Sequence, residues 1–126
     1  MTVVAGLIER GGAFLVGQRL ASASHPLKWE FPGGKVEPDE APADALRREL
    51  AEELAIEAEI GEEVTRYEYA YPGRAPILLV FYRVKSFTGE PRNLAFEQIR
   101  WVQRERLPEL DFLEGDVEFV SGLAVG

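Results

Sequence analysis

One stretch constrains the fold of this chain more than any other, and it reads GGKVEPDEAPADALRRELAEELAI from Gly33 to Ile56. It opens with two glycines, which predict a tight turn or a close approach of the backbone to a ligand. Pro42 follows at the start of a run rich in Glu and Leu, where its missing N–H costs little. The stretch therefore predicts a glycine bend and then a helix that ends near Ala55.

On a helical wheel, at about 100° per residue, this run has two distinct sides. The apolar residues share an arc of about 80°: Ala43, Leu46, Leu50 and Leu54. The carboxylates share another arc of about 100°: Glu49, Glu52 and Glu53. Like charges one turn apart oppose helix formation by a few tenths of a kcal/mol. A bound Mg²⁺, which prefers carboxylate oxygens, would account for this cluster, and the alternative is a solvated acidic face.

The order of the residues favours the metal site. Gly34 is followed by five residues, Glu40, seven more residues and then RELAEELAI from Arg48. This pattern resembles the Nudix box, G-x5-E-x7-R-E-U-x-E-E-x-G-U, in which U is a bulky aliphatic residue. Every charged position matches. Ala55 departs from the pattern, because the family usually has Gly there. Ala would cost about 1 kcal/mol in the left-handed conformation that Gly adopts at a helix end, or the helix ends differently.

At 126 residues the chain is expected to form one domain, residues 1–126. Periodicity alone predicts only a mixture of helices and strands. The resemblance implies more, namely the α/β class and a Nudix-type α/β/α sandwich, with a mixed β-sheet between helices.

Apolar and β-branched runs predict strands at Thr2–Ile8, Ala13–Gln18, Glu57–Tyr71, Ile77–Val84 and Glu97–Val102. The run Ile77–Val84 is the most apolar and is the expected central strand. Turns or loops are expected at Gly11-Gly12, Leu20–Lys28, Pro72-Gly73 and Phe87–Arg92. A short turn or helix is expected at Arg104–Leu107, and a terminal helix at Asp116–Val125, although Gly122 weakens that helix.

Composition excludes several classes of site. The chain has no Cys, so disulfides and thiolate zinc sites are excluded, and one His, His25, does not make a metal site. The net charge of −8 argues against a nucleic-acid polymer as partner, because such binders are normally basic. It remains compatible with a nucleotide bridged to the protein by metal ions. No signal peptide or membrane span is apparent, so a cytoplasmic enzyme is expected, with no membrane partner. The oligomeric state is not predicted.

The resemblance implies hydrolysis of a nucleoside diphosphate linked to another group, with Mg²⁺ as cofactor and Mn²⁺ as a substitute. Its hard oxygen ligands would be the Gly33 carbonyl and the carboxylates Glu49, Glu52 and Glu53, with Glu53 as the main direct ligand. Water would be oriented or deprotonated by Glu49 or Glu52, or by Glu97 from a later loop.

Four further residues take roles around this centre by the same resemblance. Lys35 would hold a phosphate oxygen as a point charge. Arg48 would pair with a box carboxylate and fix its rotamer. Gly34 and Glu40 would support the site, with Glu40 holding the loop to the helix.

The segment WEFPGGKVEPDE resembles the start of the box in the MutT-like branch of the family. Members of that branch convert nucleoside triphosphates to monophosphate and pyrophosphate. They favour oxidised guanine nucleotides such as 8-oxo-dGTP, or pyrimidine triphosphates in a sister group. The predicted enzyme is therefore a Nudix pyrophosphohydrolase that binds a nucleotide, in sanitation or in metabolism.

The expected substrate-binding residues are Arg19, Phe31, Arg74 and Asp116. Arg19 suits a phosphate, although a surface charge is the alternative. Phe31 would line the base pocket by resemblance, and otherwise it belongs to the core. Asp116 falls near the sequence position at which members of this branch carry an Asn that hydrogen-bonds to the edge of the guanine base. An ionised Asp only accepts hydrogen bonds, and the alternative role for Asp116 is a helix N-cap.

Two rival interpretations remain. The same scaffold cleaves ADP-ribose, dinucleoside polyphosphates and sugar nucleotides. A non-catalytic nucleotide sensor is a different class, but such modules usually lose box carboxylates that this chain keeps.

Overall fold

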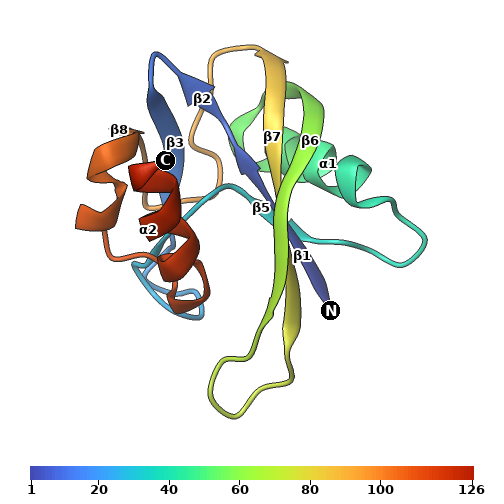
Figure 1. Cartoon of the computed structure of the whole chain (residues 1–126). Helices are drawn as coiled ribbons and strands as arrows, with labels where there is room; N and C mark the ends of the chain where they lie inside the picture. Colours follow the sequence, from blue (N-terminus) through green and yellow to red (C-terminus); the bar gives the residue numbers. More distant parts are fainter.

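Two four-stranded sheets lie between two helices in the computed structural model, which describes residues 1–126 (Figure 1). The first sheet has the order β5 (Gly33–Lys35), β1 (Thr2–Leu7), β7 (Ile77–Thr88) and β6 (Glu57–Tyr69). The second contains β2 (Glu9–Arg10), β3 (Ala13–Gln18) and β4 (Trp29–Glu30), with β8 (Gln98–Gln103) paired to β3. The helices are α1 (Pro42–Leu54) and α2 (Val117–Val125), and two 3₁₀ segments are η1 (Arg104–Glu109) and η2 (Glu114–Asp116). No helix is long and apolar enough to cross a membrane.

The first sheet is mixed, because β1 pairs in parallel with β7 and antiparallel with β5. Strand β7 lies between β1 and β6, so the expected central strand is confirmed. It is longer than predicted. The first two residues of the predicted loop, Phe87 and Thr88, pair with Ala58 and Glu57 instead, which extends the long β6–β7 hairpin.

Side chains on opposite faces of the sheets enter two separate cores. Val4 and Val80 pack in the core that also contains the apolar face of α1. Their neighbours Ala5 and Phe81 point the other way and pack with Val120 of α2. Both faces of β1 and β7 are therefore covered, which explains why these strands read as continuous apolar runs. The expected α/β/α sandwich is confirmed.

Helix α1 begins at Pro42 and buries Ala45, Leu46, Leu50 and Leu54. Ala43, expected in the apolar arc, is only half-buried, because the buried side centres on the three leucines and Ala45. The helix ends at Ala55, which takes the left-handed conformation, φ 57° and ψ 34°, and donates its N–H to the Ala51 carbonyl. The sequence departure at this position therefore leaves the usual helix end intact.

The glycine pair forms the short strand β5 and not a turn. Gly33 pairs with Ala5 and Gly34 with Val4. A Cβ on Gly33 would lie 1.9 Å from the Val4 carbonyl oxygen, so only glycine fits here. The close approach that the glycines predict is thus an approach to strand β1. Strands β2 and β4 were also not predicted, because two-residue strands carry no periodic pattern.

Candidate active site

A cavity of about 440 Å³ brings together most of the predicted site residues. Its lining includes Arg19, Phe31, Gly33, Gly34, Lys35, Glu49, Glu53 and Asp116. A second chamber of about 720 Å³ shares Arg19, Lys35 and Asp116 with the first and adds Arg74. Because they share lining residues, the two chambers adjoin, and together they are called the cleft here. It lies between the sheet, α1 and the chain that leads into α2.

Two of the three box glutamates on α1, Glu49 and Glu53, lie in this cleft, and β5 shapes their positions. Glu53 accepts a hydrogen bond from the Gly33 N–H at 3.1 Å. The Glu49 carboxylate lies against Gly34, where an added Cβ would be 2.5 Å from its Cδ. The glycine pair thus serves two purposes, strand pairing through Gly33 and room for a carboxylate at Gly34.

The cleft crowds carboxyl groups together, and Glu53 has no cationic partner among them. Burial, with the charges of Glu30 and Glu49, raises the pKa of Glu53 to about 8. Burial also raises the pKa of Glu49, although Arg48 opposes this shift. Crowded carboxylates in a partly buried site fit a hard divalent cation, which would relieve their repulsion.

The third box carboxylate is placed differently. The Glu52 side chain is 59% exposed and lies 3.6 Å from Arg48, outside the lining of the cleft. No three acidic or imidazole side chains converge closely enough to form a complete metal site. A rotamer change would be needed for Glu52 to join Glu49 and Glu53 on one ion.

Arg48 connects the loop before α1 to the box carboxylates. It donates to both carboxylate oxygens of Glu40, at 2.9 and 3.0 Å, and to Glu49 at 3.0 Å. It also donates to the Lys35 carbonyl at 3.2 Å. Glu40 accepts the Glu37 N–H at 3.1 Å, and its hydrogen bonds with Arg48 lower its pKa. The orientation of the Glu49 carboxylate is therefore tied to the position of the loop.

Glu97 lies apart from the cleft. It is exposed, it precedes β8, and its carboxylate accepts the Ala21 N–H at 3.3 Å. It lines neither chamber of the cleft. Glu49 is thus the better placed of the candidate bases.

Arg19 lines the cleft, but three of its N–H groups bond within the protein. They reach the Ser24 carbonyl at 2.7 Å, the Ser24 hydroxyl at 3.0 Å and Glu30 at 3.0 Å. Glu30, which was not predicted as a site residue, lines both chambers. The only sequence signal for it was its place between Trp29 and Phe31, which are both buried.

Phe31 is both a core residue and a cleft residue. Its side chain is 3% exposed and packs edge-on against Phe14 and Phe81, yet it lines the first chamber. The two alternatives weighed for this residue therefore do not exclude each other.

Asp116 is the one buried charged residue, 6% exposed, and it lines both chambers. It occupies the N-cap position of α2, but its side chain makes no capping hydrogen bond. The alternative prediction is thus correct for the position of Asp116, but the side chain does not cap the helix. Burial and the charge of Glu30 raise its pKa to about 7. A buried carboxyl with no partner in the protein is available to a ligand.

The comparison with known proteins now decides the family. The NUDIX domain profile matches residues 1–123. The chain belongs to the Nudix family. This Nudix chain is 40% identical over 119 residues to the CTP pyrophosphohydrolase of Escherichia coli K12, covering 94% of the chain and 87% of that protein. It is 38% identical over 125 residues to the putative 8-oxo-dGTP diphosphatase 2 of Mycobacterium tuberculosis, covering 97% and 86%.

Solved structures agree. The solution structure of the Escherichia coli ORF135 protein superposes on this Nudix chain with a TM-score of 0.86 at 37% identity, covering 98% of this chain and 88% of that one. The MutT-like resemblance, the fold and the enzyme class, a Nudix pyrophosphohydrolase, are confirmed.

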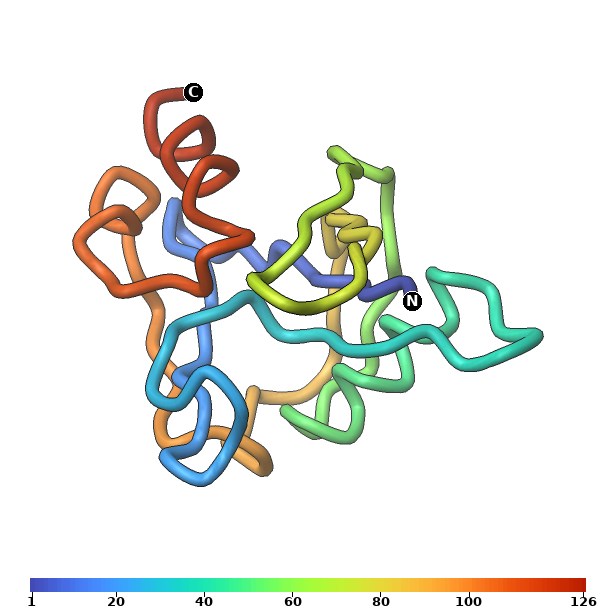
Figure 2. Tube along the Cα trace, turned by 90° about the horizontal axis from the view of Figure 1, so that it is seen from below, coloured from blue at the N-terminus to red at the C-terminus, as the bar shows by residue number.

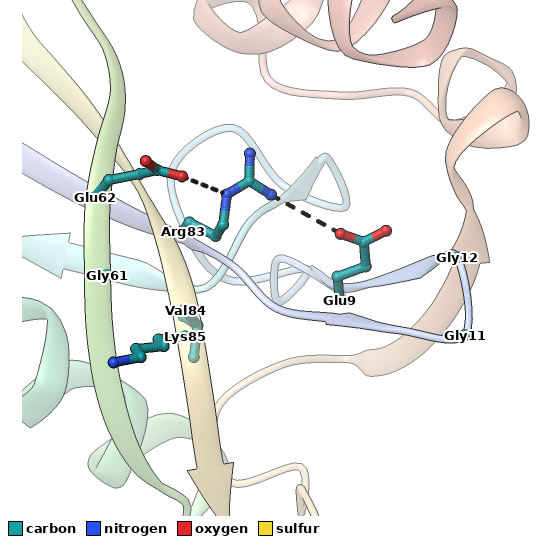
Figure 3. Close-up of a pocket in the computed structure, with 8 residues that line it drawn as sticks. All are labelled: Glu9, Gly11, Gly12, Gly61, Glu62, Arg83, Val84 and Lys85. Atoms are coloured by element: carbon teal, nitrogen blue, oxygen red, sulfur yellow. Dashed lines mark hydrogen bonds and ion pairs between the residues drawn. The ribbon is translucent and has the colours of Figure 1, made fainter.

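A separate hollow on this Nudix fold contains none of the predicted site residues (Figure 3). It lies between β6, β7 and the β2–β3 turn. Arg83 bonds to Glu62 at 3.0 Å and faces Glu9 at 3.9 Å, as the dashed lines show. Lys85, which also lines the hollow, pairs with Glu59 outside it at 3.3 Å. The charged side chains of this hollow are thus already paired within the protein.

Proposed function

We propose that this Nudix hydrolase converts nucleoside triphosphates to nucleoside monophosphate and pyrophosphate in a Mg²⁺-dependent reaction. The observation that carries the proposal is one cavity that is lined by Glu49 and Glu53 together with the buried Asp116, whose side chain has no hydrogen-bond partner in the protein. A polyphosphate can lie beside the box carboxylates while its base extends toward Asp116.

The metal would be held by Glu53, Glu49 and the Gly33 carbonyl, with Glu52 joining after a change of rotamer. Bound Mg²⁺, or Mn²⁺ in its place, neutralises phosphate oxygens and acidifies water. Arg48 holds the Glu49 carboxylate so that it can orient a water or take its proton. Lys35, which lines both chambers, binds a phosphate oxygen.

The base would lie against Phe31, with Arg74 and Asp116 at its edge. An ionised Asp116 accepts hydrogen bonds from the guanine N1–H and amino group, as a purine such as 8-oxo-dGTP offers. A protonated Asp116 donates one bond and accepts another, which matches the cytosine edge. Relatives are named for both substrates, so 8-oxo-dGTP is the first candidate and CTP the second.

A turnover screen tests this proposal. Nucleoside triphosphates, ADP-ribose and dinucleoside polyphosphates are incubated with Mg²⁺ or a chelator, and the products are identified. We expect monophosphate and pyrophosphate from 8-oxo-dGTP or CTP, with Mg²⁺ required. Glu53→Gln should lose most activity, whereas the exposed control Glu57→Gln should keep it. Release of nucleoside diphosphate and inorganic phosphate would overturn the proposal. Binding of nucleotide without turnover under saturating Mg²⁺ would also overturn it.

A further inference from the structure

Two tyrosines, Tyr67 in β6 and Tyr71 in the turn after it, hydrogen-bond to Gly115, the residue before Asp116. One bonds to the carbonyl of Gly115 and the other to its N–H. The Tyr67 hydroxyl donates to the Gly115 carbonyl at 2.6 Å. The Gly115 N–H donates to the Tyr71 hydroxyl oxygen at 3.0 Å. These contacts join positions 48 and 44 residues apart in the chain. Figure 2 shows the β6–β7 turn beside the chain that leads into α2.

Gly115 is closely enclosed by these rings. A Cβ there would lie 3.0 Å from the Tyr71 hydroxyl oxygen and 3.1 Å from the Tyr69 ring. The residue is buried, and its φ is not in the left-handed region. Glycine at position 115 therefore permits the close approach of the tyrosines, which a larger residue would push away, and it is not required by an unusual backbone angle.

We infer that Tyr67 and Tyr71 are positioning residues that set the place of the Asp116 carboxyl in the cleft, and so tune which base the enzyme prefers. This inference rests on the proposed function, in which Asp116 reads the base. Asp116 has no protein hydrogen bond on its own side chain, so the backbone before it is what fixes its carboxyl. The N–H of Asp116, bonded to the Leu113 carbonyl at 2.9 Å, adds a further restraint, as does the Val117 N–H, which bonds to the Glu114 carbonyl.

Tyr71 extends this link to the opposite wall of the cleft. Its ring lies 4.5 Å from the His25 ring, centroid to centroid, and 4.8 Å from Tyr69. His25 belongs to the loop that Arg19 holds through Ser24. Both His25 and Tyr71 line the second chamber with Asp116. The Tyr71 side chain thus joins the β6–β7 hairpin both to the backbone before Asp116 and to the loop that contains His25.

The test uses Tyr71→Phe and Tyr67→Phe, which keep the rings and remove only the hydroxyls. The matched control is Tyr69→Phe, because Tyr69 makes no hydroxyl hydrogen bond and lies in the same strand. For each variant kcat and KM are measured with 8-oxo-dGTP and with CTP. Amide exchange at Gly115 is measured by NMR, and Asp116→Ala is combined with each tyrosine variant.

We expect each variant, Tyr71→Phe and Tyr67→Phe, to change the ratio of kcat/KM between the two nucleotides about five-fold, mainly through KM, since one hydrogen bond is involved. The control Tyr69→Phe should leave the ratio unchanged. In the Asp116→Ala background the effect of either tyrosine variant on the ratio should vanish. Tyr71→Phe should also speed exchange of the Gly115 N–H.

A purely structural role would give a different result, with a lower Tm and equal losses on both nucleotides. That outcome, or unchanged Gly115 exchange in Tyr71→Phe, would overturn the inference. Failure of the proposed function is distinguishable, because the wild type would then hydrolyse neither nucleotide, while Gly115 exchange would still report on the tyrosine contacts.

Discussion

Replacing Glu53 with Gln should stabilise the protein without metal and remove its response to Mg²⁺. In the folded chain burial and nearby carboxylates raise the pKa of Glu53 from 4.5 to about 8. In the unfolded chain the pKa of this carboxyl is about 4.5, so the group is already ionised at pH 7. The folded state therefore holds the proton more tightly, and stability falls as pH rises from about 4.5 toward 8.

The magnitude follows from this difference in pKa. Between pH 4.5 and pH 7 the loss is at most about 3 kcal/mol, at about 1.4 kcal/mol for each pH unit. Partial access of solvent to the cleft reduces it to about 1–2 kcal/mol. Gln carries no charge, and its carbonyl can still accept the Gly33 N–H. For a chain of this length about 1 kcal/mol corresponds to about 4 °C in Tm.

The assay is thermal unfolding of both proteins at pH 5, 7 and 8, with a chelator or with Mg²⁺. With the chelator, Glu53→Gln should melt about 4–8 °C above wild type at pH 7, further above it at pH 8, and close to it at pH 5. Mg²⁺ at about 100 times its dissociation constant should add about 2.7 kcal/mol to the wild type and much less to the variant. The control Glu57→Gln should behave as wild type. A variant that is less stable than wild type at pH 8, or that responds equally to Mg²⁺, would refute the reasoning.

Three further predictions follow from single positions. Ala55→Gly should raise the free energy of unfolding, measured by urea titration, by about 0.5–1 kcal/mol, because Ala55 is exposed and has a left-handed backbone conformation. No gain in stability would show that this helix end is unstrained. Gly34→Ala should lower kcat with little change in Tm, because the added Cβ would displace the Glu49 carboxylate. Unchanged kinetics would show that Glu49 has no catalytic role. Because the pKa of Asp116 is raised to about 7, the preference for CTP over 8-oxo-dGTP should fall as pH rises from 6 to 8. Asp116→Asn should abolish that pH dependence, and a flat profile in the wild type would contradict it.

The fold was predictable where the sequence carried a period or a long apolar run. Helix α1 and the core strand β1 fall close to their expected bounds, because burial on one face or on both leaves a clear pattern. Strand β7 begins at the expected residue, Ile77, but continues past the predicted end, Val84, to Thr88. Strand β5 was not predicted, since two glycines carry no hydrophobic signal, and their need for space becomes visible only beside Val4 and Glu49.

The site could be predicted as far as the box motif reaches. The motif named Glu49 and Glu53, and the structure places both in one cleft. It could not predict that Glu52 points outward or that Glu97 bonds to the loop, because both depend on side-chain rotamers and loop packing. The partners of Asp116 were out of reach for another reason, since Tyr67 and Tyr71 meet Gly115 only through tertiary contacts.

The parallel pairing of β1 with β7 has a consequence for the chain as it leaves the ribosome. Strand β1 is made before β7, so it has no neighbour on one side until residues near 78–83 have been synthesised. Asp116 and α2 follow later still. A nascent chain therefore exposes apolar surface of β1 until β7 is made, and a product that stops before residue 116 lacks one wall of the cleft. The cleft is complete only after Asp116 has been synthesised.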